Sequence, residues 1–189
     1  MSKPRIIGGT ARGIRLDDVS GDITRPITDF VKEALFNILG TDVIGSTWLD
    51  VFAGTGSVGI EAISRGAQSV QLNDLNRAAI QTLYDNLKKT HLEGKGTVTQ
   101  GDAFALLARP SKKSFDFIYI APPQYKGMWE KAMDILDGNP SLVSSNGCII
   151  VQIDPIEYKA KTLLHFIEVE QRKYGNTLLL FYEPSITTN

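Results

Sequence analysis

The sequence is poor in the side chains that bind metals and form disulfides. Cys148 is its single cysteine, which excludes an intrachain disulfide and is typical of proteins in a reducing, cytoplasmic compartment. The two histidines, His91 and His165, are isolated, and no cysteine–histidine cluster has the spacing of a transition-metal site. We therefore expect no metal, and we expect Cys148 to be an inert thiol in a core strand.

Long apolar runs are also absent. No stretch approaches the roughly 20 apolar residues of a transmembrane helix, and the N-terminus lacks the pattern of a signal peptide. The formal net charge of −1 gives no general attraction to nucleic acid, and the chain has neither repeats nor low-complexity segments. These absences predict a globular protein of the cytoplasm with no membrane partner. Its 189 residues fit one domain with a small appendage.

Positive charge is concentrated at the N-terminus. Lys3, Arg5, Arg12 and Arg15 lie within the first 16 residues, which contain no acid. Arginines alternate with apolar residues around two glycines, which predicts a β-hairpin with a cationic face. We call residues 3–16 the basic arm. Its charge suits RNA phosphates, although a solvated and partly ordered terminus has the same composition.

The segment 47–65 predicts a strand, a tight turn and a helix, and it organises the rest of the chain. Residues 48–52 form an apolar, β-prone run, as a buried parallel strand requires. Gly54, Gly56 and Gly59 then form a G-x-G-x-x-G motif. The first two glycines allow the backbone to turn and approach a ligand, and the third allows the helix to pack on the strand.

Strands and helices alternate on both sides of this segment. Thr28 is the expected N-cap of a helix that ends near Leu39. Its expected apolar stripe consists of Phe30, Val31, Ala34, Leu35 and Ile38. Strands are expected at 69–73, 96–100, 115–120 and 148–153, helices at 76–89, 103–108 and 129–136, and an antiparallel pair at 166–173 and 176–182. This order predicts an α/β fold with a mostly parallel, doubly wound sheet and an antiparallel end.

Acidic residues follow three of the predicted strands, where ligands bind in such sheets. Asp74 lies 18 residues after Gly56, a position suited to accepting hydrogen bonds from two ribose hydroxyls. Asp50 is either part of this site or a local partner of turn amides. Asp102 either accepts from an adenine amino group or caps the helix that starts at Ala103. Together these residues predict an adenosine-shaped site.

The fourth strand ends in Ala121-Pro-Pro-Gln-Tyr125. Prolines donate no hydrogen bond but keep their carbonyl oxygens as acceptors. A rigid carbonyl beside an aromatic ring suits an amino group on a flat heterocycle, because the ring stacks on the base while the carbonyl accepts from the amine. The alternative interpretation is a plain strand terminator.

These motifs resemble those of S-adenosylmethionine-dependent methyltransferases acting on exocyclic amines. The resemblance lies in Asp-Val-Phe-Ala-Gly-Thr-Gly at 50–56, the acid at Asp74 and the double proline at 122–123. Two N-terminal segments narrow the resemblance to one family. They are Arg-Ile-Ile-Gly-Gly at 5–9 and Thr-Arg-Pro-Ile-Thr-Asp-Phe-Val-Lys-Glu-Ala-Leu-Phe-Asn at 24–37. They closely resemble the bacterial 16S ribosomal RNA guanine-N2 methyltransferase family of the RsmD type.

The resemblance spans nearly the whole chain and implies a function. It implies a Rossmann-like, class I methyltransferase with a seven-stranded sheet at 41–189, preceded at 1–40 by an RNA-binding extension of hairpin and helix. The implied cofactor is S-adenosylmethionine, and the implied substrate is a guanine of 16S rRNA in the small ribosomal subunit or an assembly intermediate. No metal is implied.

The expected site residues fall into three groups. The cofactor-binding residues are Asp50, Phe52, Ala53, Gly54, Gly56, Asp74, Leu75, Asp102 and Ala103. The catalytic residues are Pro122, Pro123, Gln124 and Tyr125. The RNA-binding residues are Lys3, Arg5, Arg12, Arg15 and Arg25.

One departure from the family pattern leaves alternatives open. The family's turn usually reads Asp or Asn, two prolines and an aromatic residue, whereas this chain has Ala121 and Gln124 at the outer positions. We hypothesise that Gln124 supplies the missing oxygen and that Tyr125 stacks on the base. The alternative is a catalytically impaired RNA-binding or ribosome-assembly protein. A dinucleotide-dependent oxidoreductase shares the glycine motif, and a DNA amino-methyltransferase is a weaker option without a target-recognition domain.

Overall fold

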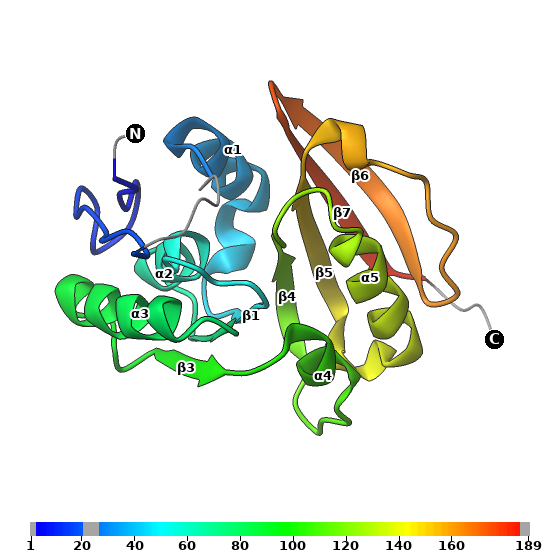
Figure 1. Cartoon of the computed structure of the whole chain (residues 1–189), viewed down its shortest axis with the longest axis horizontal. Helices are drawn as coiled ribbons and strands as arrows, with labels where there is room; N and C mark the ends of the chain where they lie inside the picture. The colour runs from blue at the N-terminus through cyan, green and yellow to red at the C-terminus, as the bar shows by residue number, and fades with distance from the viewer. Residues whose placement is uncertain (1–2, 21–26, 186–189) are drawn as a thin grey trace. The chain divides into compact units, whose positions relative to one another are not determined.

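The computed structural model describes residues 3–20 and 27–185. Its backbone divides into two compact units, with the boundary between Gly101 and Asp102. Figure 1 shows the elements of both units, most of them labelled. The division expected from the sequence, at 1–40 and 41–189, separates RNA binding from methyl transfer and not compact parts of the backbone. It stays a prediction.

The first unit contains a three-stranded parallel sheet in the order β3-β2-β1. Its elements are α1 (Asp29–Leu39), η1 (Gly40–Val43), β1 (Thr47–Asp50), α2 (Ser57–Ser64), β2 (Ser69–Asp74), α3 (Arg77–Thr90) and β3 (Gly96–Gln100). Helix α2 packs on β1 and β2, and α3 packs on β2 and β3. Added to Gly59, a Cβ atom would lie 2.4 Å from Leu72 Cδ2, so the third glycine of the motif permits this close helix–strand packing, as predicted.

Helix α1 begins as predicted, but its buried face differs from the predicted stripe. Thr28 is the N-cap, and its hydroxyl accepts from the Val31 amide. The buried residues are Val31, Lys32, Leu35, Phe36 and Leu39. Phe30 is instead 68% exposed and Ile38 36% exposed. The predicted stripe is right for Val31 and Leu35 and wrong for Phe30 and Ile38. The buried face is rotated because it includes Lys32, which a pattern of apolar residues cannot reveal.

The basic arm forms a compact turn without strands. Arg5 and Arg15 make one isolated antiparallel bridge, and the Ile6 amide donates to Ile14 O at 2.9 Å. The predicted β-hairpin ladder does not extend further because the next backbone groups bond to α2. Among them, the amides of Thr10 and Ala11 donate to the carbonyl and hydroxyl oxygens of Ser64.

The second unit contains a mixed sheet in the order β4-β5-β7-β6. Its elements are α4 (Ala103–Ala108), β4 (Phe115–Ile120), α5 (Met128–Gly138), η2 (Pro140–Leu142), β5 (Val143–Ile153), η3 (Pro155–Glu157), β6 (Phe166–Tyr174) and β7 (Thr177–Pro184). Strands β4 and β5 are parallel, whereas β7 is antiparallel to both β5 and β6. The predicted parallel sheet with an antiparallel C-terminal end is therefore confirmed.

Strand β5 starts at Val143, earlier than the predicted start at residue 148. The Ser144 hydroxyl satisfies this polar segment by donating to the Asp116 carboxylate at 2.9 Å, beside a shift in the β4–β5 register. Cys148 is half-buried in the strand, and burial raises the pKa of its thiol to about 12. The thiol therefore stays protonated at neutral pH.

The described residues give two further findings that bear on function. Across residues 3–20 and 27–185, no helix has the length and apolar character needed to cross a membrane. Over the same residues, no three His, Cys, Asp or Glu side chains gather as a group that could hold a metal ion.

Candidate active site

The glycine-rich loop after β1 is tied to the end of β2 by Asp74. The Gly54 amide donates to Asp74 Oδ2 at 2.9 Å, and the Asn76 amide donates to Oδ1 at 2.8 Å. A carboxylate oxygen has two lone pairs, so each oxygen of Asp74 keeps one for another donor. The half-buried Asp74 carboxylate is thus oriented, with capacity for two further hydrogen bonds.

The shape of the loop depends on Gly56. Its φ of +78° lies in the left-handed region, and an added Cβ would lie 2.8 Å from Leu83 Cδ2 and 2.9 Å from Ile60 Cδ1. Gly56 is also the N-cap of α2 and provides no side-chain cap, so the loop leads directly into the first turn of that helix. A side chain at Gly56 would therefore both strain the backbone and clash with the core, which is why the loop requires glycine here.

Asn73 joins the ends of all three strands in the first unit, a role that the sequence analysis missed. Its buried amide nitrogen donates to Val51 O at 3.2 Å and to Gly101 O at 3.1 Å, and its oxygen accepts from the Thr99 hydroxyl. Its backbone oxygen accepts from the Ala53 amide. The side chain could have been suspected only from its position beside Asp74, because its partners lie 22 to 28 residues away in sequence.

Asn86 supports the same loop from α3. Its amide nitrogen donates to Thr55 O at 2.9 Å and to Asp17 O at 3.0 Å, while its oxygen accepts from the Asp17 amide at 2.7 Å. This buried asparagine therefore connects the glycine-rich loop to the residue that follows the basic arm. This role was not predicted, because an asparagine on a helix gives no local sign of such partners.

Asp50 ends β1 as a buried acid, with 1% of its surface exposed. It accepts from the Gly59 amide in α2, whereas its Oδ1 atom has no hydrogen-bond partner among the described residues. Burial raises the pKa of the carboxyl from 3.8 to about 7, although the Gly59 amide lowers it, and the nearby charge of Asp74 raises it further. Asp50 is thus a partner of helix α2 rather than of the turn amides.

The raised pKa of Asp50 predicts that stability falls as pH rises. Between the unfolded pKa of 3.8 and the folded pKa of about 7, the folded state binds more protons, so rising pH lowers the free energy of unfolding. The slope from this group reaches about 1.4 kcal/mol per pH unit. Asp50→Asn removes it, so urea unfolding should show the variant gaining stability relative to the parent from pH 4 to 7. Parallel stability curves would refute the assignment.

The other predicted cofactor residues have mixed surroundings. Leu75 is 67% exposed beside Asp74, and Phe52 is half-buried. In the second unit, Asp102 caps α4 by accepting from the Ala105 amide at 2.8 Å, which confirms the capping interpretation. The Ala103 side chain is buried at the start of this helix. An adenine contact by Asp102 stays a prediction.

The turn after β4 holds Tyr125 in an unusual backbone conformation. Tyr125 has a φ of +62°, a left-handed value that is uncommon outside glycine. Its amide donates to Glu157 Oε1 at 2.7 Å, and its hydroxyl donates to Asp154 Oδ2 at 2.9 Å. The side chain is nevertheless 65% exposed. Hydrogen bonds therefore hold both the backbone amide and the hydroxyl of Tyr125, while its ring stays exposed to solvent.

Asp154 and Glu157 are the functional candidates in the second unit that the sequence analysis missed. They form a capping box around η3, directly after β5. Nothing in the local sequence around Asp154 and Glu157 indicated their contacts with Tyr125. Pro122 and Pro123 are half-buried and Gln124 is exposed. Ala121 provides no carboxylate, so the acids of this turn region come from the segment after β5.

The cations of the basic arm divide into two pairs. Lys3 forms an ion pair with Asp17 at 3.1 Å, and Arg5 forms one with Asp29 at 2.7 Å. Arg12 and Arg15 are exposed and have no ion pair among the described residues. The predicted RNA-binding Arg25 lies outside the described residues. A shallow depression of about 190 Å³ opens on the arm, and its lining is Arg5, Ile6, Ile7, Arg12, Gly13 and Glu33.

The first unit fits a nucleoside cofactor. The free lone pairs of Asp74 suit a ribose diol, and exposed Leu75 offers apolar surface beside it. Gly54, where an added Cβ would meet no atom within 4 Å, leaves the loop backbone open to close approach. The unpartnered buried oxygen of Asp50 adds an acceptor at the same strand end. Among the described residues nothing in this geometry conflicts with S-adenosylmethionine.

Comparison with known proteins gives the family. Residues 4–183 match the model of a family described as "Conserved hypothetical protein 95". The "Putative rRNA methyltransferase YlbH" of Bacillus subtilis is 35% identical over 95% of this chain and 98% of its own length. The "Ribosomal RNA small subunit methyltransferase D" of Escherichia coli K12 is 36% identical over 71% of this chain and 67% of its own.

A solved structure agrees with these relatives. The "Putative methyltransferase yhhF" of Escherichia coli superposes with a TM-score of 0.83 at 30% identity, covering 96% of this chain and 97% of that protein. These proteins carry methyltransferase names, which favours that activity over the oxidoreductase alternative. The chain therefore belongs to the Conserved hypothetical protein 95 family, and it is an RsmD-type, S-adenosylmethionine-dependent methyltransferase.

Proposed function

We propose that this protein methylates the N2 amino group of a guanine in 16S ribosomal RNA. The substrate is the small ribosomal subunit or an assembly intermediate in the cytoplasm, and the methyl donor is S-adenosylmethionine. The names of the relatives refer to ribosomal RNA and to the small subunit. The choice of guanine N2 rests on the resemblance of residues 5–9 and 24–37 to the RsmD-type motifs.

The observation that carries the proposal is the joint geometry of Asp74 and the glycine-rich loop. The Asp74 carboxylate accepts hydrogen bonds from the Gly54 and Asn76 amides at 2.9 and 2.8 Å, and it retains two lone pairs for a ribose. We assign Phe52, Ala53 and Leu75 to the adenosine surroundings, and Asp102 and Ala103 to the adenine end. When bound, S-adenosylmethionine supplies an electrophilic methyl group.

The chain's own residues orient the acceptor amine. Pro122 and Pro123 have no N–H to donate but keep carbonyl oxygens that can accept from an amino group. We assign the Pro122 carbonyl and the exposed Gln124 amide oxygen to the guanine amine. Tyr125, fixed by Asp154 and Glu157, offers its ring for stacking, a contact of about 1–3 kcal/mol per base.

Catalysis in this proposal is mainly positioning. Holding amine and methyl group at near-attack distance contributes roughly 7–11 kcal/mol to lowering the barrier. Unstacking the guanine costs a few kcal/mol, and less in a loop. The fixed backbone of Tyr125 serves this function because a prearranged ring loses little freedom when the base binds.

A second candidate function is favoured by one observation. Ala121 supplies no carboxylate to the target amine, and Gln124 forms no hydrogen bond that would fix its oxygen among the described residues. A protein that binds cofactor and ribosomal RNA without turnover would share this turn. It would assist ribosome assembly rather than modify the RNA.

Methyl transfer in vitro separates the two candidates. Small subunits from a strain that lacks the modification should accept labelled methyl groups from S-adenosylmethionine when the wild-type protein is added. Subunits from the parent strain provide the control, because their target guanine is already methylated. Cofactor binding without incorporation into either kind of subunit would favour the assembly protein.

The arginines of the basic arm without ion pairs should contribute to RNA binding and not to cofactor binding. Arg12→Ala combined with Arg15→Ala should weaken binding to the small subunit. Because two phosphate contacts are lost, the slope of log affinity against log salt should fall by about 2. Calorimetry should find the affinity for S-adenosylhomocysteine unchanged.

A matched pair of lysines controls for net charge. Lys88 and Lys95 are exposed in the same unit and form no ion pair among the described residues. Lys88→Ala combined with Lys95→Ala removes the same charge and should leave RNA affinity nearly unchanged. Equal loss in both double variants would mean that the arm has no special role.

A further inference from the structure

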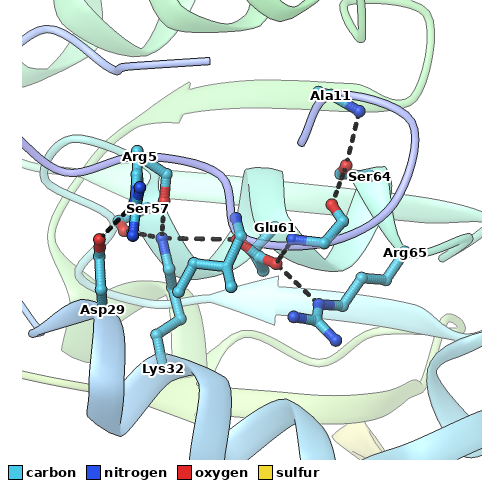
Figure 2. A network of polar contacts seen from close by, with 10 residues as sticks. Arg5, Ala11, Asp29, Lys32, Ser57, Glu61, Ser64 and Arg65 are labelled. Atoms are coloured by element: carbon cyan, nitrogen blue, oxygen red, sulfur yellow. Dashed lines mark hydrogen bonds and ion pairs between the residues drawn. The ribbon is translucent and has the colours of Figure 1, made fainter. Parts of the chain in front are cut away.

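Lys32 is a lysine whose side chain is completely buried. Its ammonium group donates to Arg5 O at 2.5 Å and to Ser57 Oγ at 2.9 Å, and it lies 3.5 Å from Glu61 Oε2 (Figure 2). Burial lowers the pKa of this lysine, while Glu61 opposes the shift. A buried ion pair is often no more stabilising than apolar residues of similar size. Core stability alone therefore does not explain why a lysine occupies this position.

The three partners of Lys32 belong to functionally different segments. Arg5 is at the base of the basic arm, where it bridges to Arg15. Ser57 is the first residue of α2 and directly follows the glycine-rich loop. Glu61, one turn further along α2, accepts from the amides of Ile7 and Gly8 at 2.8 Å each. One ammonium group thus connects the arm to the helix that begins at the loop.

The contact with Arg5 acts on the hydrogen bond that closes the arm. Arg5 C=O and Ile6 N–H belong to the same peptide group, and this N–H donates to Ile14 O at 2.9 Å. A cation on the carbonyl polarises the peptide and strengthens the bond made by its N–H. Ile14 lies between Arg12 and Arg15. The position of the unpaired arginines therefore depends on a peptide that Lys32 holds.

The contact with Ser57 connects Lys32 to the glycine-rich loop. Gly56, the N-cap of α2, has no side chain to fix the first helical turn, so the conformation of the loop determines where the Ser57 hydroxyl lies. A ligand that orders the loop would order Ser57 and, through it, Lys32. Asn86 forms a separate connection, from Thr55 O to the backbone of Asp17.

We propose that Lys32 is a positioning residue that couples cofactor binding at the glycine-rich loop to the order of the basic arm. The inference rests on the proposed function, because it requires the loop to bind the cofactor and the arm to bind RNA. Coupling between two binding sites is reciprocal, so cofactor and RNA should tighten each other's binding by the same factor. Couplings of this kind typically amount to about 5- to 150-fold.

Ser57→Ala tests the proposal with little disturbance. It removes the hydroxyl that Lys32 contacts in α2 but keeps Lys32, Glu61 and the contact with Arg5 O. Lys32→Met is less informative, because it leaves the buried Glu61 without its cation and threatens folding. Ser64→Ala is a matched control, since Ser64 is also a buried serine of α2 that bonds to the arm, through Gly8 and Ala11.

Amide hydrogen exchange, with and without S-adenosylhomocysteine, provides the measurement. In the wild-type protein the ligand should slow exchange of the Ile6 amide at least about fivefold. In Ser57→Ala this effect should disappear, while the Asp17 amide, held by Asn86, should respond as before. Ser64→Ala should exchange faster at Ala11 and retain the ligand effect at Ile6.

Two results would overturn the inference. One is an equal effect of the ligand at Ile6 in Ser57→Ala and in the wild-type protein. The other is no effect at Ile6 in any variant although calorimetry shows that the ligand binds. No RNA is present in these samples, so both results leave the RNA assignment intact. Failure of the wild-type protein to bind S-adenosylhomocysteine would instead contradict the proposed function, and this inference with it.

Discussion

Asp74→Ala should weaken binding of S-adenosylhomocysteine about 100-fold. The carboxylate is assigned to two ribose hydroxyls, and hydrogen bonds to a charged group contribute about 1.5–3 kcal/mol each. Two such bonds at the lower end of this range amount to about 3 kcal/mol, which is about two powers of ten in affinity. The substitution also releases the Gly54 amide, which is bonded to Oδ2 at 2.9 Å, so the loop loses its connection to β2. Isothermal titration calorimetry measures the change directly.

Asp85→Ala is the control for this prediction. Asp85 is an exposed acid on α3 in the same unit, and it accepts a hydrogen bond from Gln81 Nε2 at 3.1 Å. Its removal changes the net charge equally and should leave the dissociation constant within about twofold. An Asp74→Ala protein that stays folded and binds as tightly as the control would show that the cofactor lies elsewhere.

Glu61→Gln should destabilise the folded protein by about 3–5 kcal/mol, because it leaves a buried cation without its counter-charge. Glu61 is fully buried and accepts from the amides of Ile7 and Gly8. It also accepts from Arg65 Nε at 2.7 Å (Figure 2). The NH2 group of the new glutamine would also face one of the N–H groups that now donate to Glu61, and that hydrogen bond would be lost. Urea unfolding followed by circular dichroism gives the change in free energy.

Two further variants sharpen this test. Glu93→Gln changes an exposed acid in the same unit and should shift the free energy of unfolding by less than about 0.5 kcal/mol. Adding Lys32→Met to Glu61→Gln should restore part of the lost stability, since both buried charges are then absent. If the double variant is instead less stable than Glu61→Gln, the two buried charges do not compensate each other, and this interpretation is contradicted.

Local signals in the sequence predicted most helices and strands. Thr28, Asn76 and Asp102 are N-caps in the structure, and each accepts from an amide two or three residues further on. Strands β3 and β4 have the predicted bounds, because each is a short β-prone run with clear ends. Caps and strand ends depend on neighbouring residues, which is why one sequence is enough to find them.

Pairs distant in sequence were not predictable in the same way. Lys32 occupies a core position on α1 because Glu61 and two oxygens satisfy its charge, and nothing within residues 28–39 indicates those partners. The basic arm forms no ladder because Glu61 and Ser64 take its amides from more than 50 residues away. In both cases tertiary contacts determine the local structure.

In the candidate site, too, local features were predicted and contacts between distant residues were missed. The glycine motif predicted the loop, and the spacing predicted Asp74 as an acceptor for a ribose. The hydrogen bond from the Gly54 amide to Asp74 was not predicted. Asn73 was missed because its role is to join three strand ends, which only the folded sheet brings together. Asp154 and Glu157 were missed because their partner, Tyr125, precedes them by about 30 residues.

Mass mapping of ribosomal RNA tests the central claim most directly. RNA from the small subunit is digested and compared between cells with and without this protein, and between cells carrying the wild-type chain and Asp74→Ala. We predict one guanine that carries an N2-methyl group in the wild type and is lighter by one CH2 unit in the other two strains. An identical methylation pattern in all strains, with the protein folded and expressed, would contradict it.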